Sequence, residues 1–140
     1  MPKINGTSVL GILAATIGFY MVGFLFYGVI FMEKWMTLAG VPMDGEVNPM
    51  TYVWGLLITL LQVLGLNYIL QHAGAKTLAT CAKISLIVAV LIPVVVVSYA
   101  MIYAGAPSEL FLIDAAHMLL GYVLAGIILS FFRGKGALDA

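Results

Sequence analysis

Residues 8–32 read SVLGILAATIGFYMVGFLFYGVIFM, an apolar run without a charged side chain. A helix of about 20 such residues spans the hydrocarbon core of a bilayer. The run is also longer than the apolar region of a signal peptide, roughly 7–15 residues, and no small-residue cleavage site follows it. We therefore expect this segment to stay in the protein as a membrane-spanning helix.

Three further apolar runs follow, at residues 49–71, 77–104 and 109–132. Asn48 is suited to cap the first of these, because an asparagine side chain can accept a hydrogen bond from the first helical turn. Pro49 then takes the first helical position, where its missing N–H costs nothing. Pro93 lies near the centre of the next run and predicts a kink. The sequence thus predicts an all-α integral membrane bundle of four transmembrane helices, a single domain over residues 1–140.

Composition supports lipid as the solvent of this chain. Hydrophobic residues make up 64% and charged residues 9%, whereas roughly a quarter of the residues in soluble domains are charged. Six basic and six acidic residues give a net charge of zero, so there is no basic surface for nucleic acid. Cys81 is the single cysteine; it excludes an internal disulfide and is expected to be a small buried apolar side chain.

The distribution of basic residues predicts the orientation in the membrane. Five of the six lie at the two termini or around the turn between the second and third helices: Lys3, Lys76, Lys83, Arg133 and Lys135. Only Lys34 lies on the other side. Because positive charge favours the cytoplasmic face, we expect a multi-pass protein of the bacterial inner membrane with both termini in the cytoplasm.

The longest connection, residues 33–48, contains its own apolar stretch around Trp35. We expect a short helix here that lies at the membrane interface after the first span. Trp35, Tyr52 and Trp54 would then anchor the bundle as an aromatic belt at headgroup depth.

Three short motifs stand at the helix ends: Tyr27, Phe31 and Trp35 after the first, Asn48-Pro49 before the second, and residues 110–115 (LFLIDA) at the start of the fourth. Together they resemble the bacterial four-helix membrane family known as domain of unknown function 1761. The resemblance covers nearly the whole chain and implies the four-helix architecture without supplying an activity. The family often has a tyrosine where this chain has His117, so any chemistry of His117 would be particular to this chain.

Asp114 and His117 are three residues apart and therefore share one face of the fourth helix. Ionisable groups at this depth normally face the bundle interior or water. Helical rise places other polar side chains at similar depths. The predicted buried polar cluster consists of Asp114, His117, Tyr27, Tyr99, Thr59 and Gln62.

Small residues on two helices let backbones approach closely. They predict helix packing, within the bundle or between subunits, at Gly11, Ala15, Gly18, Gly23, Gly121 and Ala125.

Metal binding, haem binding and hydrolysis each require more than Asp114 and His117 supply. Asp114 and His117 supply only two metal ligands, fewer than a metal site needs unless a second subunit brings its own pair. Within one monomer, His72 lies too far from His117 in depth for a haem held by both. A triad with Ser98 lacks an evident oxyanion hole. We therefore expect no catalytic residue, no metal and no cofactor.

The sequence favours a protein that is not an enzyme and that acts by packing and binding, as a homo-oligomer or an accessory subunit of a larger membrane complex. Its expected partners are the lipid bilayer and other copies or membrane subunits. The alternative is a small transporter with a polar lining of Asp114, His117 and Gln62, although few polar groups continue the path below Gln62. A membrane enzyme acting on a lipid or quinone is the third reading.

Overall fold

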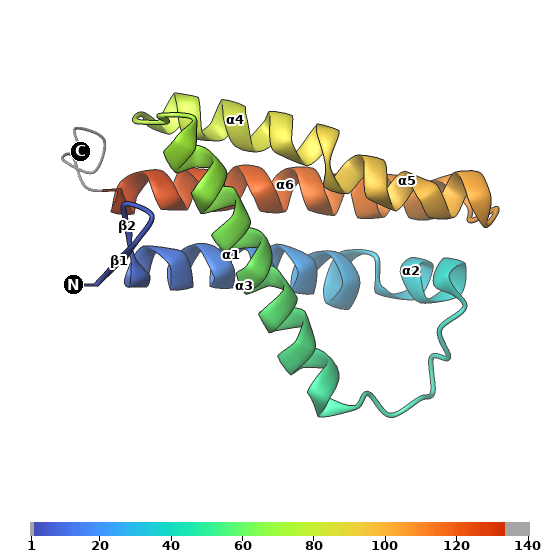
Figure 1. Ribbon diagram of the computed structural model, residues 1–140. Helices are drawn as coiled ribbons and strands as arrows, with labels where there is room; N and C mark the ends of the chain where they lie inside the picture. Colours follow the sequence, from blue (N-terminus) through green and yellow to red (C-terminus); the bar gives the residue numbers. More distant parts are fainter. Residues whose placement is uncertain (1, 134–140) are drawn as a thin grey trace.

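The computed structural model describes residues 2–133. Along the chain the elements are β1 (Lys3–Ile4), β2 (Thr7–Ser8), α1 (Val9–Leu25), the π-helix η1 (Phe26–Ile30), α2 (Met32–Ala39), α3 (Pro49–His72), α4 (Leu78–Leu91), α5 (Pro93–Tyr103) and α6 (Ser108–Phe132) (Figure 1).

Within residues 2–133, four helical spans are long and apolar enough to cross a membrane: Val9–Ile30, Pro49–His72, Leu78–Tyr103 and Ser108–Phe132. The predicted fold class, a membrane bundle of four helices, is therefore confirmed.

The local signals at two helix ends act as expected. The Asn48 side chain accepts a hydrogen bond from the backbone N–H of Met50 (2.9 Å), and Pro49 is the first residue of α3. Pro93 interrupts the third span, because α4 ends at Leu91 and α5 begins at Pro93 itself. A proline cannot donate the backbone hydrogen bond that would continue α4.

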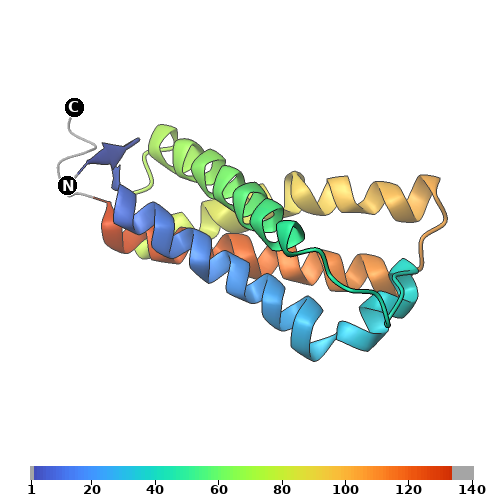
Figure 2. The same ribbon diagram turned by 90° about the horizontal axis from the view of Figure 1, so that it is seen from below.

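Helix α6 is the centre of the bundle and packs against α1 on one side and against α4 and α5 on the other. Figure 1 shows these helices side by side, with α3 crossing them obliquely so that its first half extends away from the others. Figure 2 gives the same picture of α1 and α6 as neighbours. The four spans are thus not equally embedded in the bundle.

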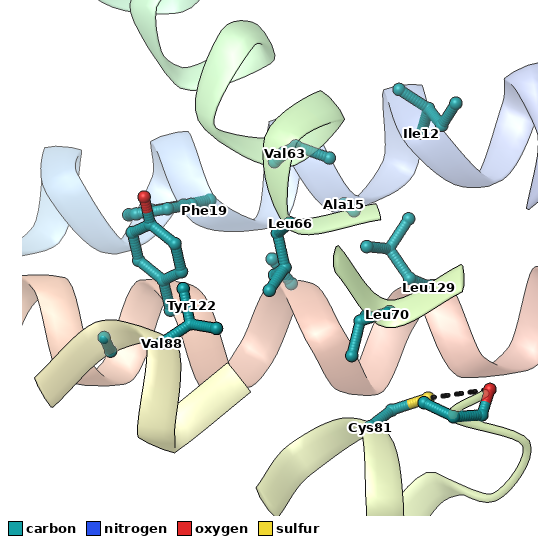
Figure 3. Close-up of a cluster of buried hydrophobic side chains, with 13 residues drawn as sticks. Ile12, Ala15, Phe19, Val63, Leu66, Leu70, Cys81, Val88, Tyr122 and Leu129 are labelled. Carbon is teal, nitrogen blue, oxygen red and sulfur yellow. Dashed lines mark hydrogen bonds between the residues drawn. The ribbon is translucent and has the colours of Figure 1, made fainter. Parts of the chain in front are cut away.

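The hydrophobic core lies in the half of the bundle that contains β1, β2 and the end of α6 (Figure 1). Figure 3 shows its buried side chains, contributed by α1, α3, α4 and α6. Phe19, Leu66, Leu70 and Leu129 are the largest apolar side chains that are fully buried. The opposite half is more open, since Pro93 is the only residue of α5 that is buried.

A feature that the sequence reasoning missed is a hairpin before α1. Strand β1 pairs antiparallel with β2, and Asn5 (φ 47°) and Gly6 (φ 77°) form the two-residue turn between them. Positive φ at both positions is the geometry of a type I′ turn, for which Asn-Gly is the preferred pair. Thr7 also forms a β-bridge with Arg133 at the end of α6, so the hairpin closes this end of the bundle.

The short helix expected after the first span is present as α2. It lies at the end of the bundle opposite the hairpin and the α3–α4 turn (Figure 1). We refer to these as the α2 end and the hairpin end. The position of α2 at the membrane interface stays a prediction, and so does the cytoplasmic location of the hairpin end.

Candidate functional site

Three polar side chains meet near the α2 end of the bundle: Tyr27 from η1 and Asp114 and His117 from α6. The Tyr27 hydroxyl donates a hydrogen bond to Asp114 Oδ1 at 2.7 Å and lies 3.3 Å from His117 Nδ1. We call these residues the Tyr27 cluster. They share one point of contact, the Tyr27 oxygen.

Tyr27 reaches α6 from a widened helical turn. In η1 the backbone N–H of Phe31 donates to the carbonyl of Phe26 at 2.9 Å, five residues back. This π-turn lets two consecutive aromatic rings face the same imidazole, because the ring centroids of Phe26 and Tyr27 lie 6.0 and 5.0 Å from that of His117. Such turns are frequently found at functional sites.

The Tyr27 hydroxyl has two polar neighbours in the cluster. A hydroxyl carries one hydrogen, and that of Tyr27 is directed to Asp114. In the contact between the Tyr27 oxygen and His117 Nδ1, the tautomer of the imidazole decides which atom donates. Within residues 2–133 no hydrogen-bond partner is present for Nε2. Gly23 leaves room for this atom, since a Cβ at that position would be 3.1 Å from Nε2.

Most of the chain, including the Tyr27 cluster, matches a known protein family. Residues 10–130 match the sequence model of a family described as "Protein of unknown function (DUF1761)". The chain belongs to the DUF1761 family. No curated protein and no solved structure matches it. The matched range of this DUF1761 protein includes the whole Tyr27 cluster but ends before Arg133.

Three of the six residues predicted for the polar cluster lie elsewhere in this DUF1761 protein. Tyr99 is 54% exposed and its ring is tilted against that of Tyr103, so its prediction as a buried cluster member was wrong. Thr59 is buried, but its hydroxyl donates to the carbonyl of Gly55 within its own helix (2.8 Å). The reason is geometric: helical rise fixes the depth of a residue but not the direction in which its side chain points.

Gln62 forms a second polar site, nearer the middle of the bundle. Its Nε2 atom lies 3.9 Å from Met118 Sδ, and its side chain is within hydrogen-bonding reach of Tyr122. Tyr122 is buried and packs edge-on against Phe19, with ring centroids 5.2 Å apart (Figure 3). The Phe19 ring contacts both Tyr122, the neighbour of Gln62, and His117. It therefore lies between the Gln62 site and the Tyr27 cluster.

A third polar site, at the hairpin end, was not predicted. Asn67 is fully buried; its side chain accepts from the Thr7 hydroxyl (2.6 Å) and donates to the carbonyl of Ile4 (2.9 Å). Arg133 donates to Asn67 Oδ1 (3.4 Å) and to Gln71 Oε1 (2.8 Å). Burial lowers the pKa of the Arg133 guanidinium, but arginine stays protonated in proteins. The signal in the sequence was Asn67 itself, an amide in an otherwise apolar run.

The small residues predicted for packing lie between α1 and α6. A Cβ at Gly18 would be 2.6 Å from Ile128, one at Gly11 would collide with Phe132, and one at Gly121 would collide with Phe19. Ala15 and Ala125 are fully buried. Of the two open readings, within the bundle or between subunits, the structure places these residues within the bundle.

A second close approach, between α4 and α6, was missed. A Cβ at Gly126 would collide with Ser85 and lie 3.1 Å from the carbonyl oxygen of Cys81. Cys81, Ser85 and Ala89 are fully buried, and their spacing of four residues was the available signal.

The three predicted anchor residues have different environments. Trp35 is half-buried and its ring packs against Tyr27 at an interplanar angle of 60°, with centroids 5.1 Å apart. Tyr52 and Trp54 are more than half exposed on the first turns of α3. Trp35 therefore also fastens α2 to the Tyr27 cluster.

Proposed function

We propose that this DUF1761 protein acts by packing and binding in the membrane, and that its partner is a second copy of the same chain. The observation that carries the proposal is the first half of α3. Residues 49–54 and 56–58 are all exposed, and Gly55 is half-buried. A helix that is apolar on every side is suited to a position among other helices or lipid.

An apolar groove lies beside this exposed segment. It has a volume of about 350 Å³ and lies between α1 and α3; Leu13 and Ile17 form one wall and Val53 and Leu57 the other. The exposed first half of α3 and the groove between α1 and α3 thus occur on the same chain. A two-fold axis would place the first half of α3 from each copy against the groove of the other, as in an isologous dimer.

The alternative, transport along Asp114, His117 and Gln62, has less support. Between Tyr122 and the polar site around Asn67 lie apolar side chains that exclude water: Val63, Leu66, Ala125 and Leu129 are at most 1% exposed. A path for ions or protons would have to cross this layer.

Cross-linking in membranes tests the proposed dimer. The only native cysteine, Cys81, is fully buried, and Cys81→Ala supplies a cysteine-free background. We expect Leu57→Cys in one tagged copy to cross-link to Ile17→Cys in a second copy through a short bifunctional reagent. Leu112→Cys is the matched control, because it is an exposed leucine on α6 outside the groove.

The outcomes separate the candidate functions. Dimers from the Leu57 and Ile17 pair, and none from the Leu112 control, support the proposal. A product that contains Leu57→Cys joined to a different membrane protein would favour the accessory-subunit reading. Monomers throughout would overturn binding through α3.

A further inference from the structure

A second groove lies at the α2 end, between η1, α2 and α6, and has a volume of about 390 Å³. Its walls are apolar and come from Phe26, Phe31, Leu112, Ile113 and Ala116. Lys34 and Glu109 complete the lining. We call it the rim groove. It does not share a residue with the groove between α1 and α3.

The two charged residues of the rim groove form an ion pair. Lys34 Nζ lies 3.2 Å from Glu109 Oε2, and the side chains are 54% and 58% exposed. Glu109 is in the first turn of α6 and Lys34 follows the end of the first span. Charges at the ends of apolar spans belong at the level of the lipid headgroups, so the groove leads from that level toward the hydrocarbon region.

We propose that the rim groove binds one zwitterionic phospholipid with an ethanolamine headgroup. The lipid phosphate pairs with Lys34, the ammonium pairs with Glu109, and part of an acyl chain lies along the apolar wall. The lipid phosphate thereby takes the place of the Glu109 carboxylate beside Lys34. The lipid ammonium takes the place of the Lys34 ammonium beside Glu109. This inference is independent of the proposed dimer.

Headgroup chemistry is what selects the ligand. An anionic headgroup satisfies Lys34 but brings a second negative charge toward Glu109. A choline headgroup has the correct charge, but its quaternary nitrogen has no hydrogen to donate. A primary ammonium donates charge-assisted hydrogen bonds to a carboxylate. Phosphatidylethanolamine therefore matches both sides of the rim.

Tryptophan quenching in lipid nanodiscs measures this preference. The chain has two tryptophans, and Trp54→Phe leaves Trp35, next to Lys34, as the single reporter. Nanodiscs of phosphatidylcholine receive the same minor fraction of phosphatidylethanolamine, phosphatidylglycerol or phosphatidylcholine with brominated acyl chains. We expect phosphatidylethanolamine to quench Trp35 with about two- to fivefold higher apparent affinity, because exposed ion pairs are modest interactions.

Single charge changes make the test specific. Glu109→Gln should shift the preference from phosphatidylethanolamine to anionic phosphatidylglycerol, because Lys34 then lacks its negative partner. Lys34→Gln should remove the preference for phosphatidylethanolamine. Glu46→Gln is the matched control and should change nothing, since Glu46 is exposed in the loop before α3.

A bulky side chain tests the apolar wall. Ala116→Phe should fill the groove and leave Trp35 equally quenched by all three brominated lipids. If that variant does not fold, the two charge variants still decide, because both side chains are more than half exposed. Equal quenching by the three lipids in the Trp54→Phe parent, or an unchanged preference in Glu109→Gln, would overturn the proposal.

Discussion

Asp114 is an acidic residue within an apolar span, and its surroundings account for its presence there. Lipid cannot solvate a carboxyl group, and such residues normally face protein or water. Here the partner is the Tyr27 hydroxyl at 2.7 Å, contributed by a different span. His117 approaches the same oxygen atom from one turn further along α6. The three side chains therefore connect α6 to the end of the first span.

Substitutions at Asp114 should distinguish a structural role from a chemical one. Asp114→Asn keeps an oxygen that accepts from Tyr27, so we expect normal folding and assembly. Asp114→Leu leaves the Tyr27 hydroxyl without its acceptor and should cost about 1–3 kcal/mol. Thermal unfolding and size-exclusion chromatography in mild detergent measure both effects.

Tyr27→Phe should destabilise the protein by a similar amount, because it leaves Asp114 without its donor. Tyr99→Phe removes the same hydroxyl from an exposed ring and should have no effect.

A stable Asp114→Leu variant would contradict the structural role. If Asp114→Asn assembles normally but abolishes a measurable proton, ion or substrate flux, the transport reading should replace the proposed one.

At the scale of elements, close helix packing depends on glycines of α1 and α6. Gly18 of α1 faces Ile128, whereas Gly126 of α6 faces Ser85 and the Cys81 backbone. In a membrane, the solvent around the helices is as apolar as their side chains, so association relies on such close packing. Helix α6 uses this device on two sides, toward α1 and toward α4.

Gly18→Leu and Gly126→Leu should each hold two helices apart. We expect a loss of about 1–3 kcal/mol, the usual range for overpacking, measured by thermal unfolding in detergent. Gly65→Leu is the matched control, because no neighbouring atom lies within 4 Å of a Cβ at that position of α3. Equal stability of all three variants would mean that the glycines of α1 and α6 do not determine packing.

Gly23→Leu should act differently from Gly18→Leu, since a side chain at Gly23 meets the imidazole of His117. It is expected to disturb the Tyr27 cluster as well as the helix contact.

At the scale of the whole molecule, the two ends of the bundle differ in charge and construction. The hairpin end is closed by Asn67 and Arg133 with their hydrogen bonds to Thr7 and Gln71. The α2 end carries the Lys34–Glu109 pair and the exposed first turns of α3. Because most basic residues lie at the hairpin end, the positive-inside bias predicts that this end faces the cytoplasm.

Accessibility labelling tests this orientation. Tags at both termini should be reached only from the cytoplasmic side, whereas Asp44→Cys, in the Cys81→Ala background, should react with a membrane-impermeant reagent added outside. A label at residue 44 that is protected from the outside reagent would reverse the predicted orientation.

The order of residues along the chain was enough to predict the class of fold and the approximate course of the chain. Apolar runs longer than about 20 residues have few alternatives to membrane-spanning helices, because every backbone polar group must be paired inside its own segment. Asn48-Pro49 and Pro93 then marked helix boundaries through local backbone chemistry alone. These signals act between near neighbours, so no knowledge of the tertiary structure was required.

Which side chains meet follows from the packing of the helices in space. Tyr27 and Tyr99 were assigned similar depths, yet one binds Asp114 and the other is exposed. The rotation of each helix about its axis depends on packing against its neighbours, and nearly uniform apolar helices carry little amphipathic pattern that would predict it. The pairing of Asn67 with Thr7, the approach of Gly126 to Ser85 and the oblique course of α3 likewise depend on contacts between segments far apart in the sequence.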